Sequence, residues 1–295
     1  MQTSPANVST LHMLLAHAER VLATGPHPEK SRRDAEVLLL HLLHKNAPGA
    51  NLAWLIAHQD EIASADVANA LRELVERRAA GEPLQYITGE TEFYHLPIEV
   101  NRDVLIPRPE TELLVEKAVE LARDFPTPRI LDVGTGSGAI AIALAHECPA
   151  AMVTATEISE AALKIARRNA ANIRVADRIR FLQGDLLEPV AAEKFDLVVS
   201  NPPYVPERDR ESLSVEVRDF EPPQALFAGE DSLAVYRRLI PAAFDALVSG
   251  GFVVLEIGYG QKESVAALLA NSGFTETHFT PDLQGIPRIA SARRP

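Results

Sequence analysis

Four residues that follow an apolar segment have the types and spacing needed to hold a planar –NH2 group. Asn201-Pro-Pro-Tyr204 comes directly after Phe195–Ser200, which we expect to be a strand. The side-chain oxygen of Asn201 and the backbone carbonyl of Pro202 can each accept one N–H, and the ring of Tyr204 can lie on a flat group. Pro202 and Pro203 fix their own φ angles and keep the residue before each of them extended, so the loop is stiff before a substrate arrives.

This arrangement suits methyl transfer to an amide or aromatic amino nitrogen. Such a nitrogen is a poor nucleophile because its lone pair is delocalised, and the same delocalisation makes an amide planar. Asn201, Pro202 and Tyr204 are therefore the candidate catalytic residues, and together with Pro203 they form the candidate substrate site. Positioning alone can supply up to about 7–11 kcal/mol of the barrier, so we expect no dedicated general base.

A glycine-rich turn provides the candidate cofactor site. Gly134-Thr-Gly-Ser-Gly138 follows the expected strand Arg129–Val133 and opens the expected helix Ala139–Glu147. Glycines permit a sharp turn, and a helix N-terminus offers N–H groups to a carboxylate or phosphate. Glu157 ends the next expected strand, where its carboxylate can accept hydrogen bonds from a ribose diol. The run also fits the dinucleotide fingerprint G-x-G-x-x-[GA], so these features predict an adenosine-containing cofactor without identifying it.

The two motifs together favour one cofactor. A hydride-transfer enzyme has no use for Asn201-Pro-Pro-Tyr204, so a nicotinamide dinucleotide is disfavoured and S-adenosylmethionine is expected. Both motifs follow expected strands, and ligands of doubly wound sheets bind at the carboxyl ends of the strands. We therefore expect one cavity to join the loop and the glycine turn.

Hydrophobic spacing divides the chain into two regions. Up to about Gly81, apolar residues recur at helical spacing in four segments, with Ser9 as the expected N-cap of the first, which predicts a small helical bundle. Residues 91–100 are expected to form a β-hairpin. From Arg129 onward, strands alternate with helices, which predicts an α/β fold with a mostly parallel, doubly wound sheet. One of these helices is expected over 232–248, with Gly250-Gly251 as its cap. The expected domains are 1–84 (helical), 85–106 (hairpin linker) and 107–295 (cofactor domain).

Composition narrows the function classes. The chain has 295 residues, a formal net charge of −12 and one cysteine, Cys148, which alone cannot form an internal disulfide or anchor a cysteine zinc site. We therefore expect no metal. No apolar run reaches the roughly 20 residues that span a bilayer, and no signal pattern stands at the N-terminus, so a soluble cytoplasmic protein without a membrane partner is expected. The acidic charge disfavours nucleic acid as a direct partner, unless basic residues gather on one face.

Further stretches along nearly the whole chain carry a family resemblance. With Asn201-Pro-Pro-Tyr204, the chain resembles the release factor glutamine methyltransferases at residues 83–90, 93–94, 104–112, 131–138, 221–226 and 282–288. The Arg-Pro-Glu-Thr-Glu run at 108–112 and the Leu-Gln-Gly-Ile-Pro-Arg run at 283–288 are far more specific than Asn-Pro-Pro-Tyr. That tetrapeptide is shared with adenine-N6 methyltransferases of nucleic acids, so this activity is the alternative.

The resemblance implies a helical N-terminal domain that helps to dock the substrate, a hairpin link and a seven-stranded methyltransferase domain. It also implies the reaction: a methyl group passes from S-adenosylmethionine to the side-chain amide nitrogen (N5) of the glutamine in the Gly-Gly-Gln motif of peptide chain release factors. A release factor would then be the protein partner of this chain.

The resemblance finally implies a role for each matching site residue. The methionine part of the cofactor would lie against Gly134, Thr135, Gly136, Ser137 and Gly138. Glu157 would bind the ribose, and Asp185 with Leu186 the adenine edge. Asn201 would contact the cofactor as well as the substrate amide, which residues 201–204 would hold.

Three features of the site depart from the family pattern or leave two interpretations open. Glu157 is one methylene longer than the aspartate that is frequent at this position, and Leu186 stands where relatives can have a large aromatic ring. Leu186 offers adenine an apolar contact in place of that ring. The segment from Arg108 to Glu112 either lines the pocket or begins a helix, with Pro109 in the first turn.

Overall fold

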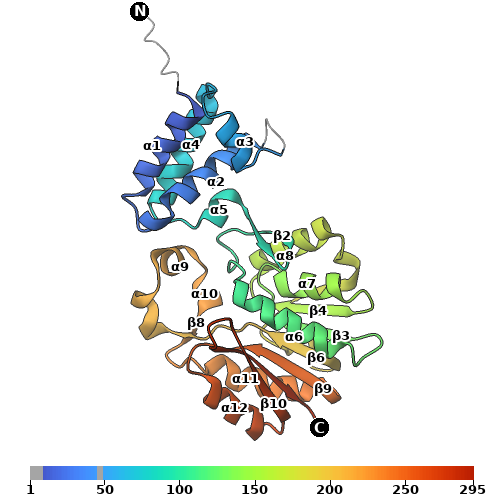
Figure 1. The fold of residues 1–295 in the computed structure, drawn as a ribbon. Helices are drawn as coiled ribbons and strands as arrows, with labels where there is room; N and C mark the ends of the chain where they lie inside the picture. The colour runs from blue at the N-terminus through green and yellow to red at the C-terminus, as the bar shows by residue number, and fades with distance from the viewer. Residues whose placement is uncertain (1–8, 45–48) are drawn as a thin grey trace, which may run out of the picture. The chain divides into compact units, whose positions relative to one another are not determined.

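Two compact units make up the chain, and the computed structural model describes residues 9–44 and 49–295 (Figure 1). One unit contains Met1–Gly89 together with Ser214–Phe220, and the other contains Glu90–Leu213 and Glu221–Pro295. Residues 1–8 of the expected helical domain lie outside the described residues. The domain limits 1–84, 85–106 and 107–295 stay predictions. No signal in the hydrophobic pattern indicated that Ser214–Phe220 packs with the helical unit.

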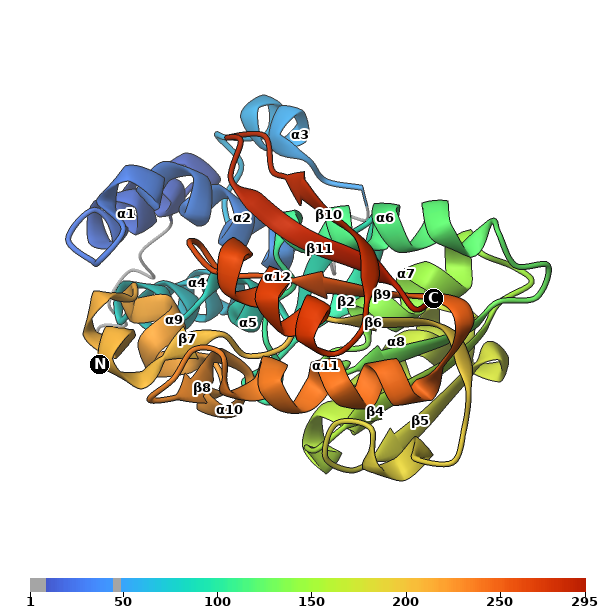
Figure 2. The same cartoon turned by 90° about the horizontal axis from the view of Figure 1, so that it is seen from below.

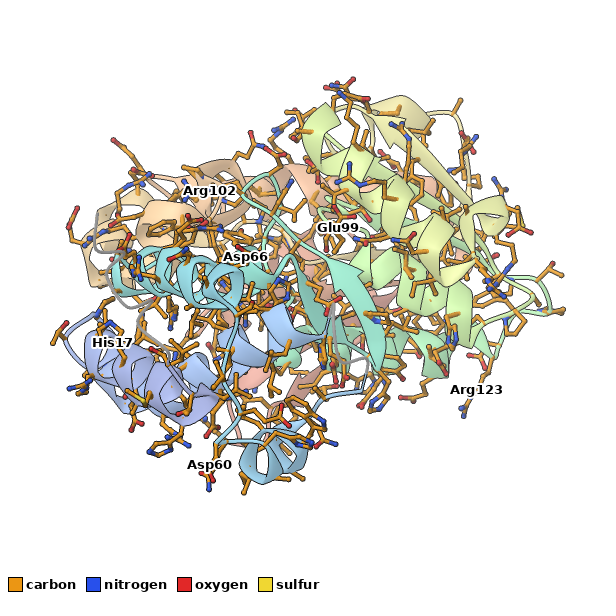
Figure 3. The ribbon with its side chains drawn as sticks, turned by 90° about the horizontal axis from the view of Figure 1, so that it is seen from above. His17, Asp60, Asp66, Glu99, Arg102 and Arg123 are labelled. Carbon is orange, nitrogen blue, oxygen red and sulfur yellow. The ribbon has the colours of Figure 1, made fainter. Side chains whose placement is uncertain are left out.

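The first unit is a bundle of amphipathic helices. Its elements are α1 (Leu11–Leu22), η1 (Pro28–Lys30), α2 (Ser31–Leu43), α3 (Leu52–Ala57), α4 (Ala65–Ala79), α5 (Leu84–Thr88) and α9 (Val215–Phe220). The apolar faces of α1, α2 and α4 bury against one another, with Leu38 and Leu39 fully buried between them. Polar side chains such as His17 and Asp60 are exposed on the outside of the bundle (Figure 3).

Thr10, and not Ser9, caps helix α1. The backbone of Thr10 is extended, and its hydroxyl oxygen accepts a hydrogen bond from the backbone nitrogen of Met13 at 3.3 Å. Both residue types are good N-caps, so the sequence alone does not decide between neighbours. Thr10 also forms a β-bridge with Ile62, which fixes where the chain enters the helix.

A buried arginine ties the segment 214–220 to the bundle. Arg78 of α4 has a side chain that is only 3% exposed, and its guanidinium contacts Asp34 of α2 at 2.6 Å and Glu216 of α9 at 2.5 Å. It also donates to the backbone oxygen of Glu82 at 3.0 Å. A guanidinium that is removed from water needs such partners. The ion pairs of Arg78 therefore connect α4 with α2 and with α9.

A seven-stranded sheet forms the centre of the second unit, with the order β10-β11-β9-β6-β3-β4-β5. The strands are β3 (Arg129–Val133), β4 (Met152–Glu157), β5 (Ile179–Gln183), β6 (Phe195–Ser200), β9 (Leu247–Glu256), β10 (Thr275–Pro281) and β11 (Pro287–Arg293). Strands β9, β6, β3, β4 and β5 run parallel, whereas β11 and β10 pair antiparallel. The predicted doubly wound α/β fold is confirmed.

Helices cover both faces of this sheet. Helices α6 (Glu112–Ala122), α7 (Ala139–Glu147) and α8 (Glu160–Ile173) lie on one face, and α11 (Ala234–Ala246) and α12 (Lys262–Asn271) lie on the other (Figure 2). Because both faces are covered, the central strands β3 and β6 are nearly continuous apolar runs. The strand order reverses between β3 and β6, which leaves a crevice at their carboxyl ends.

Short elements complete the second unit. They are the hairpin β1 (Glu90–Phe93) and β2 (Leu96–Glu99), the pair β7 (Val205–Pro206) and β8 (Phe227–Gly229), helix α10 (Pro223–Leu226), and the 3-10 turns η2 (Pro109–Thr111), η3 (Ala176–Arg178), η4 (Glu188–Val190) and η5 (Glu207–Ser212). The hairpin confirms the strand pair expected at 91–100. In the described part of the chain, every helix is too short or too polar to cross a bilayer.

The hairpin is fastened to helix α8. The backbone nitrogen of Glu99 donates to Asn169 Oδ1 at 2.8 Å, and Asn169 Nδ2 donates to the backbone oxygen of Glu99 at 3.0 Å. Arg168 pairs with the Glu99 carboxylate at 2.6 Å. Asn169 Nδ2 also donates to the backbone oxygen of Ser137 at 2.9 Å, so one buried amide supports both the hairpin and the glycine turn.

A helix predicted over 232–248, with Gly250-Gly251 as its cap, ends earlier in the structure. Helix α11 stops at Ala246, and both glycines lie inside β9. The Gly250 nitrogen donates to the Arg294 oxygen, and the Arg294 nitrogen donates to the Gly251 oxygen, each at 2.8 Å. A Cβ on Gly251 would stand 2.8 Å from the backbone oxygen of Asp196. These glycines therefore permit two backbones to approach closely within a strand. In the sequence pattern, glycines in a strand cannot be distinguished from glycines that cap a helix.

Asp132 is a buried carboxyl group in strand β3. Its exposed fraction is 0%, and its Oδ2 accepts a hydrogen bond from the Thr135 hydroxyl at 2.6 Å. Burial raises the pKa of Asp132 from 3.8 to about 7, although the Thr135 hydroxyl lowers it. Between these two values the native protein binds a proton that the unfolded chain lacks, so stability decreases as the pH rises through this range.

This difference predicts that the free energy of unfolding falls by about 1 kcal/mol as the pH rises from about 6 to about 8, because one pKa unit corresponds to roughly 1.4 kcal/mol. The fall should level off above the native pKa. Asp132→Asn keeps the size of the side chain but cannot ionise, so its stability should lack this component. Urea unfolding followed by circular dichroism across that pH range measures both proteins. Parallel curves for the two would contradict the assignment.

Candidate active site

The glycine turn leaves its backbone open on one side. Gly134, Gly136 and Gly138 have φ angles of 76°, 55° and 84°, in the left-handed region that favours glycine. A Cβ on Gly134 or Gly136 would meet no heavy atom within 4 Å, whereas one on Gly138 would lie 3.0 Å from the Cβ of Ala166. The first two glycines therefore face free space, and the third permits close packing of α7 against α8.

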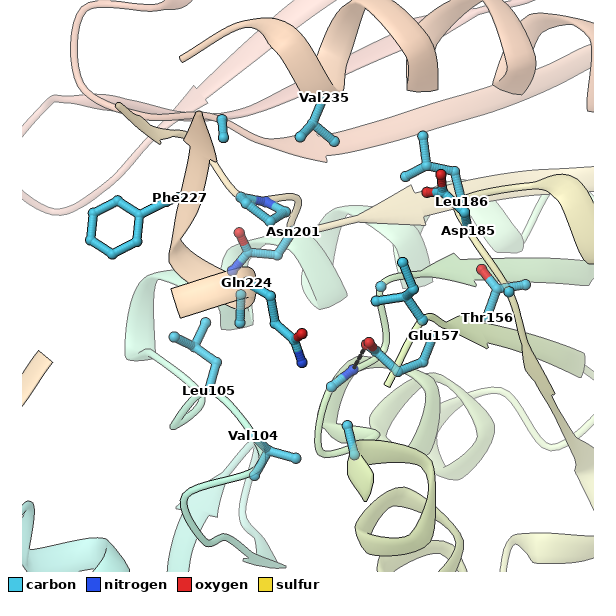
Figure 4. Close-up of a pocket in the computed structure, with 18 of the residues that line it drawn as sticks. Val104, Leu105, Thr156, Glu157, Asp185, Leu186, Asn201, Gln224, Phe227 and Val235 are labelled. Carbon is cyan, nitrogen blue, oxygen red and sulfur yellow. Dashed lines mark hydrogen bonds between the residues drawn. The ribbon is translucent and has the colours of Figure 1, made fainter. Parts of the chain in front are cut away.

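Glu157 is held at the edge of this turn by two backbone groups. Its Oε2 accepts from the nitrogen of Gly136 at 2.9 Å (Figure 4), and its Oε1 accepts from the nitrogen of Ser159 at 3.0 Å. A carboxylate has about four acceptor positions, so each oxygen keeps capacity for a ligand. The longer side chain of glutamate is thus fixed in one orientation.

One cavity of about 280 Å³ joins the glycine turn to the loop 201–204 (Figure 4). Among its lining residues are seven that the sequence singled out: Gly134, Gly136, Glu157, Asp185, Leu186, Asn201 and Pro203. The sequence did not indicate several others, including Val104, Leu105, Gln224, Phe227, Val235 and Arg238. Val104 and Leu105 lie in the matching stretch 104–112 and Gln224 lies in 221–226, so the family resemblance was a signal for these three. Phe227, Val235 and Arg238 carried none.

The remaining predicted residues are not among those that line this cavity. Thr135 and Ser137 are buried, and they bond to Asp132 and Asn169 respectively. Gly138 packs against α8, as described above. Pro202 is buried, and Tyr204 lines a second cavity, of about 410 Å³, with Gly258 and Tyr259. These residues support the turn and the loop without lining the cavity of about 280 Å³.

Asp185 and Leu186 line the part of the cavity next to the end of strand β5. The Asp185 carboxylate pairs with Arg238 of α11 at 2.5 Å. Leu186 has a φ of 47°, an uncommon value for a residue with a side chain, and that side chain packs against the core of the sheet. An arginine and an apolar side chain thus line the region where the family resemblance implies adenine.

A buried hydrogen-bond network lies beside the loop 201–204. Asn201 Nδ2 donates to Thr111 Oγ1 at 3.1 Å, and the Thr111 hydroxyl donates to Glu256 Oε2 at 2.6 Å. The Tyr204 hydroxyl donates to Glu256 Oε1 at 3.3 Å. Burial raises the pKa of Glu256, although the hydrogen bonds from Thr111 and Tyr204 lower it. Burial also raises the pKa of Tyr204, so the phenol of Tyr204 stays a hydrogen-bond donor at neutral pH.

The structure decides between the two interpretations of the segment from Arg108 to Glu112. Pro109–Thr111 forms a 3-10 turn that leads into α6, so the segment begins a helix, and none of its residues lines the cavity. Arg108 instead pairs at 2.5 Å with Glu221, whose side chain is 1% exposed. Through Thr111, however, the segment contacts Asn201.

Comparisons with known proteins agree with this geometry. The profile named Methyltransferase small domain matches residues 109–218, and the PrmC N-terminal domain matches residues 13–89. A protein named release factor glutamine methyltransferase from Geobacter sulfurreducens is 42% identical over 90% of this chain and 90% of its own length. The protein of the same name from Moorella thermoacetica is 42% identical over 97% of this chain and 99% of its own length. The one from Bordetella pertussis is 43% identical over 89% of this chain and 95% of its own length.

Solved structures share the fold at low sequence identity. The hMettl16 catalytic domain in complex with MAT2A 3′UTR hairpin 1 has a TM-score of 0.58 and 14% identity, over 91% of this chain and 93% of that chain. A methyltransferase from Pyrococcus furiosus has a TM-score of 0.50 and 21% identity, over 68% and 89%. The predicted methyltransferase activity and S-adenosylmethionine as cofactor are confirmed by the sequence relatives. Their identity extends over nearly the whole chain, and this chain therefore belongs to the release factor glutamine methyltransferase family.

Proposed function

We propose that this chain transfers a methyl group from S-adenosylmethionine to N5 of the glutamine in the Gly-Gly-Gln motif of peptide chain release factors. The observation that supports this function is the cavity shared by the glycine turn and Asn201. A cofactor site and an acceptor for a planar –NH2 group thus adjoin. The relatives that match most of the chain are named release factor glutamine methyltransferase.

The residues around the cavity fit the cofactor. Gly134 and Gly136 leave room for a ligand against their backbone, and the N-terminus of α7 offers N–H groups to the methionine carboxylate. Thr135, Ser137 and Gly138 keep this turn in place. Glu157 accepts from the ribose hydroxyls, and Asp185 and Leu186 meet the adenine. When bound, the cofactor supplies a methyl group activated by a positively charged sulfur.

Residues 201–204 hold the substrate amide in this proposal. Asn201 Oδ1 accepts one N–H of the glutamine amide, and the backbone oxygen of Pro202 accepts the other. Pro203 keeps the loop stiff, and Tyr204 contacts the flat face of the amide. Two acceptors orient the nitrogen and raise its electron density as it attacks, and the excess proton leaves after transfer.

A release factor is the partner in this proposal, and the helical unit is the candidate docking surface. The expected cytoplasmic location belongs to the same proposal, because release factors act on ribosomes. Adenine-N6 methylation of nucleic acid uses the same –NH2 chemistry and is the alternative. The net charge of −12 opposes a phosphate backbone, so we keep this alternative as an outcome of the test.

Methyl transfer to defined acceptors tests the proposal. The protein is incubated with cofactor that carries a labelled methyl group and with intact release factor, release factor whose Gly-Gly-Gln glutamine is replaced, or DNA. We expect label on intact release factor only, at the side-chain amide identified by mass spectrometry. Label on DNA, or equal label on both release factors, would overturn the proposed substrate.

Asn201→Ala tests the role of the amide. Loss of one preorganised hydrogen-bond partner of the reacting group typically costs about 10²–10³ in kcat, so we expect turnover to be nearly abolished. The Kd for the cofactor, measured by calorimetry, should stay nearly unchanged, since the glycine turn and Glu157 remain. The matched control is Asn271→Ala at the exposed end of α12, which should behave as wild type. Equal loss of cofactor binding and turnover in Asn201→Ala would contradict this role.

A further inference from the structure

A carboxylate at the end of strand β9 is buried with hydroxyl groups as its partners. Glu256 is 2% exposed and accepts from the hydroxyls of Thr111 and Tyr204. Within residues 9–44 and 49–295, no lysine or arginine forms a salt bridge with it; the charge of Arg288 lowers the pKa of Glu256, but the Arg288 guanidinium pairs with Asp282 at 3.0 Å. Burying a carboxylate without an ion pair is costly unless hydrogen bonds compensate. Packing alone therefore does not explain why a glutamate stands at this buried position.

The hydrogen bond from Thr111 to Glu256 determines which atom of the Asn201 amide can bond to Thr111. A hydroxyl group has one hydrogen, and Thr111 donates it to Glu256 at 2.6 Å. Toward Asn201 the Thr111 oxygen can therefore only accept, which it does from Nδ2 at 3.1 Å. The amide of Asn201 thus has its –NH2 side directed at Thr111, and its oxygen, Oδ1, lies on the opposite side of the amide.

That orientation is the one that a donor substrate requires. Asn201 lines the cavity that reaches the glycine turn (Figure 4). With Nδ2 committed to Thr111, Oδ1 is available to accept an N–H. If the amide were rotated by half a turn, it would present its own N–H groups to the –NH2 group of the substrate, and two donors repel each other.

We propose that Thr111 and Glu256 are positioning residues for methyl transfer, which hold the Asn201 amide with its oxygen toward the substrate nitrogen. This inference rests on the proposed function of Asn201. Neither Thr111 nor Glu256 lines the cavity, so they act through the loop. Glu256 also bonds to Tyr204, so a single carboxylate fixes both ends of Asn201-Pro-Pro-Tyr204.

A further contact holds the backbone of Glu256 in place. The hydroxyl of Tyr236, a residue that is 0% exposed, donates to the backbone oxygen of Glu256 at 2.7 Å. Thr111 is 4% exposed and stands where the turn Pro109–Thr111 enters α6. Two elements that are far apart in sequence therefore meet at the loop.

Thr111→Val and Thr111→Ser separate this role from simple packing. Valine has nearly the shape of threonine but no hydroxyl group, so the Asn201 amide loses its fixed orientation. We expect kcat for methylation of release factor to fall roughly 10- to 100-fold, the scale expected when a reacting group is misplaced. KM for release factor and Kd for the cofactor should change by less than about twofold. Thr111→Ser keeps the hydroxyl group and should restore most of kcat.

A matched substitution controls for the loss of a buried hydroxyl group. Thr154 of β4 is 7% exposed and accepts from Arg180 at 3.2 Å, away from the loop, so Thr154→Val should leave kcat unchanged. If Thr111→Val does not fold, Thr111→Ala makes the same test without the risk of crowding. An unchanged kcat in the folded variant, or equal loss in the valine and serine variants, would overturn the inference. A wild-type protein that binds cofactor but never labels release factor would instead overturn the proposed function.

Discussion

A carboxamide accepts a hydrogen bond on one side and donates on the other, and the site depends on which side of Asn201 faces the cavity. The substrate nitrogen of the proposed reaction is itself a donor, so only the oxygen of Asn201 can hold it. In the structure the choice is made by hydrogen bonds that begin at Glu256 and pass through Thr111. The orientation therefore exists before any substrate arrives, which is the form of preorganisation that lowers a barrier most effectively.

The doubly wound sheet brings the groups of the site to one edge. The glycine turn follows β3, Glu157 ends β4, Asp185 follows β5, and Asn201 follows β6. These four strands run parallel and lie next to one another, so their carboxyl ends meet at the same edge of the sheet. Since β3, β4 and β6 are buried strands, the positions of the glycine turn, Glu157 and Asn201 are fixed by the core, whereas Asp185 follows β5 at the edge of the sheet.

Local signals in the sequence predicted much of this arrangement. The bounds of β3, α7 and β6 agree with those expected, because buried strands and helices next to strong turn signals have clear limits. The glycine turn and Asn201 could be assigned for the same reason, since each motif is contiguous and follows a strand. Gly250-Gly251 was misread because a glycine in a strand and a glycine at a helix end give the same pattern.

The contacts that the sequence did not predict join distant segments. Thr111 and Glu256 are 145 residues apart, and nothing in either local pattern indicates the other. The hydrophobic spacing of helix α11 indicates that Arg238 lies on an exposed face. It does not indicate that Arg238 pairs with Asp185. Likewise, the ion pair of Glu216 with Arg78 places 214–220 in the helical unit, although the surrounding segments belong to the other. Such contacts are set by how whole elements pack, which a single sequence does not state.

The most direct test of the central claim is a crystal structure of the protein with S-adenosylhomocysteine and a peptide that contains Gly-Gly-Gln. We expect the glutamine amide nitrogen to lie within about 3.2 Å of both Asn201 Oδ1 and the backbone oxygen of Pro202. Asn201 Nδ2 should still donate to Thr111. A glutamine amide bound away from residues 201–204, or one whose oxygen faces Asn201 Nδ2, would contradict it.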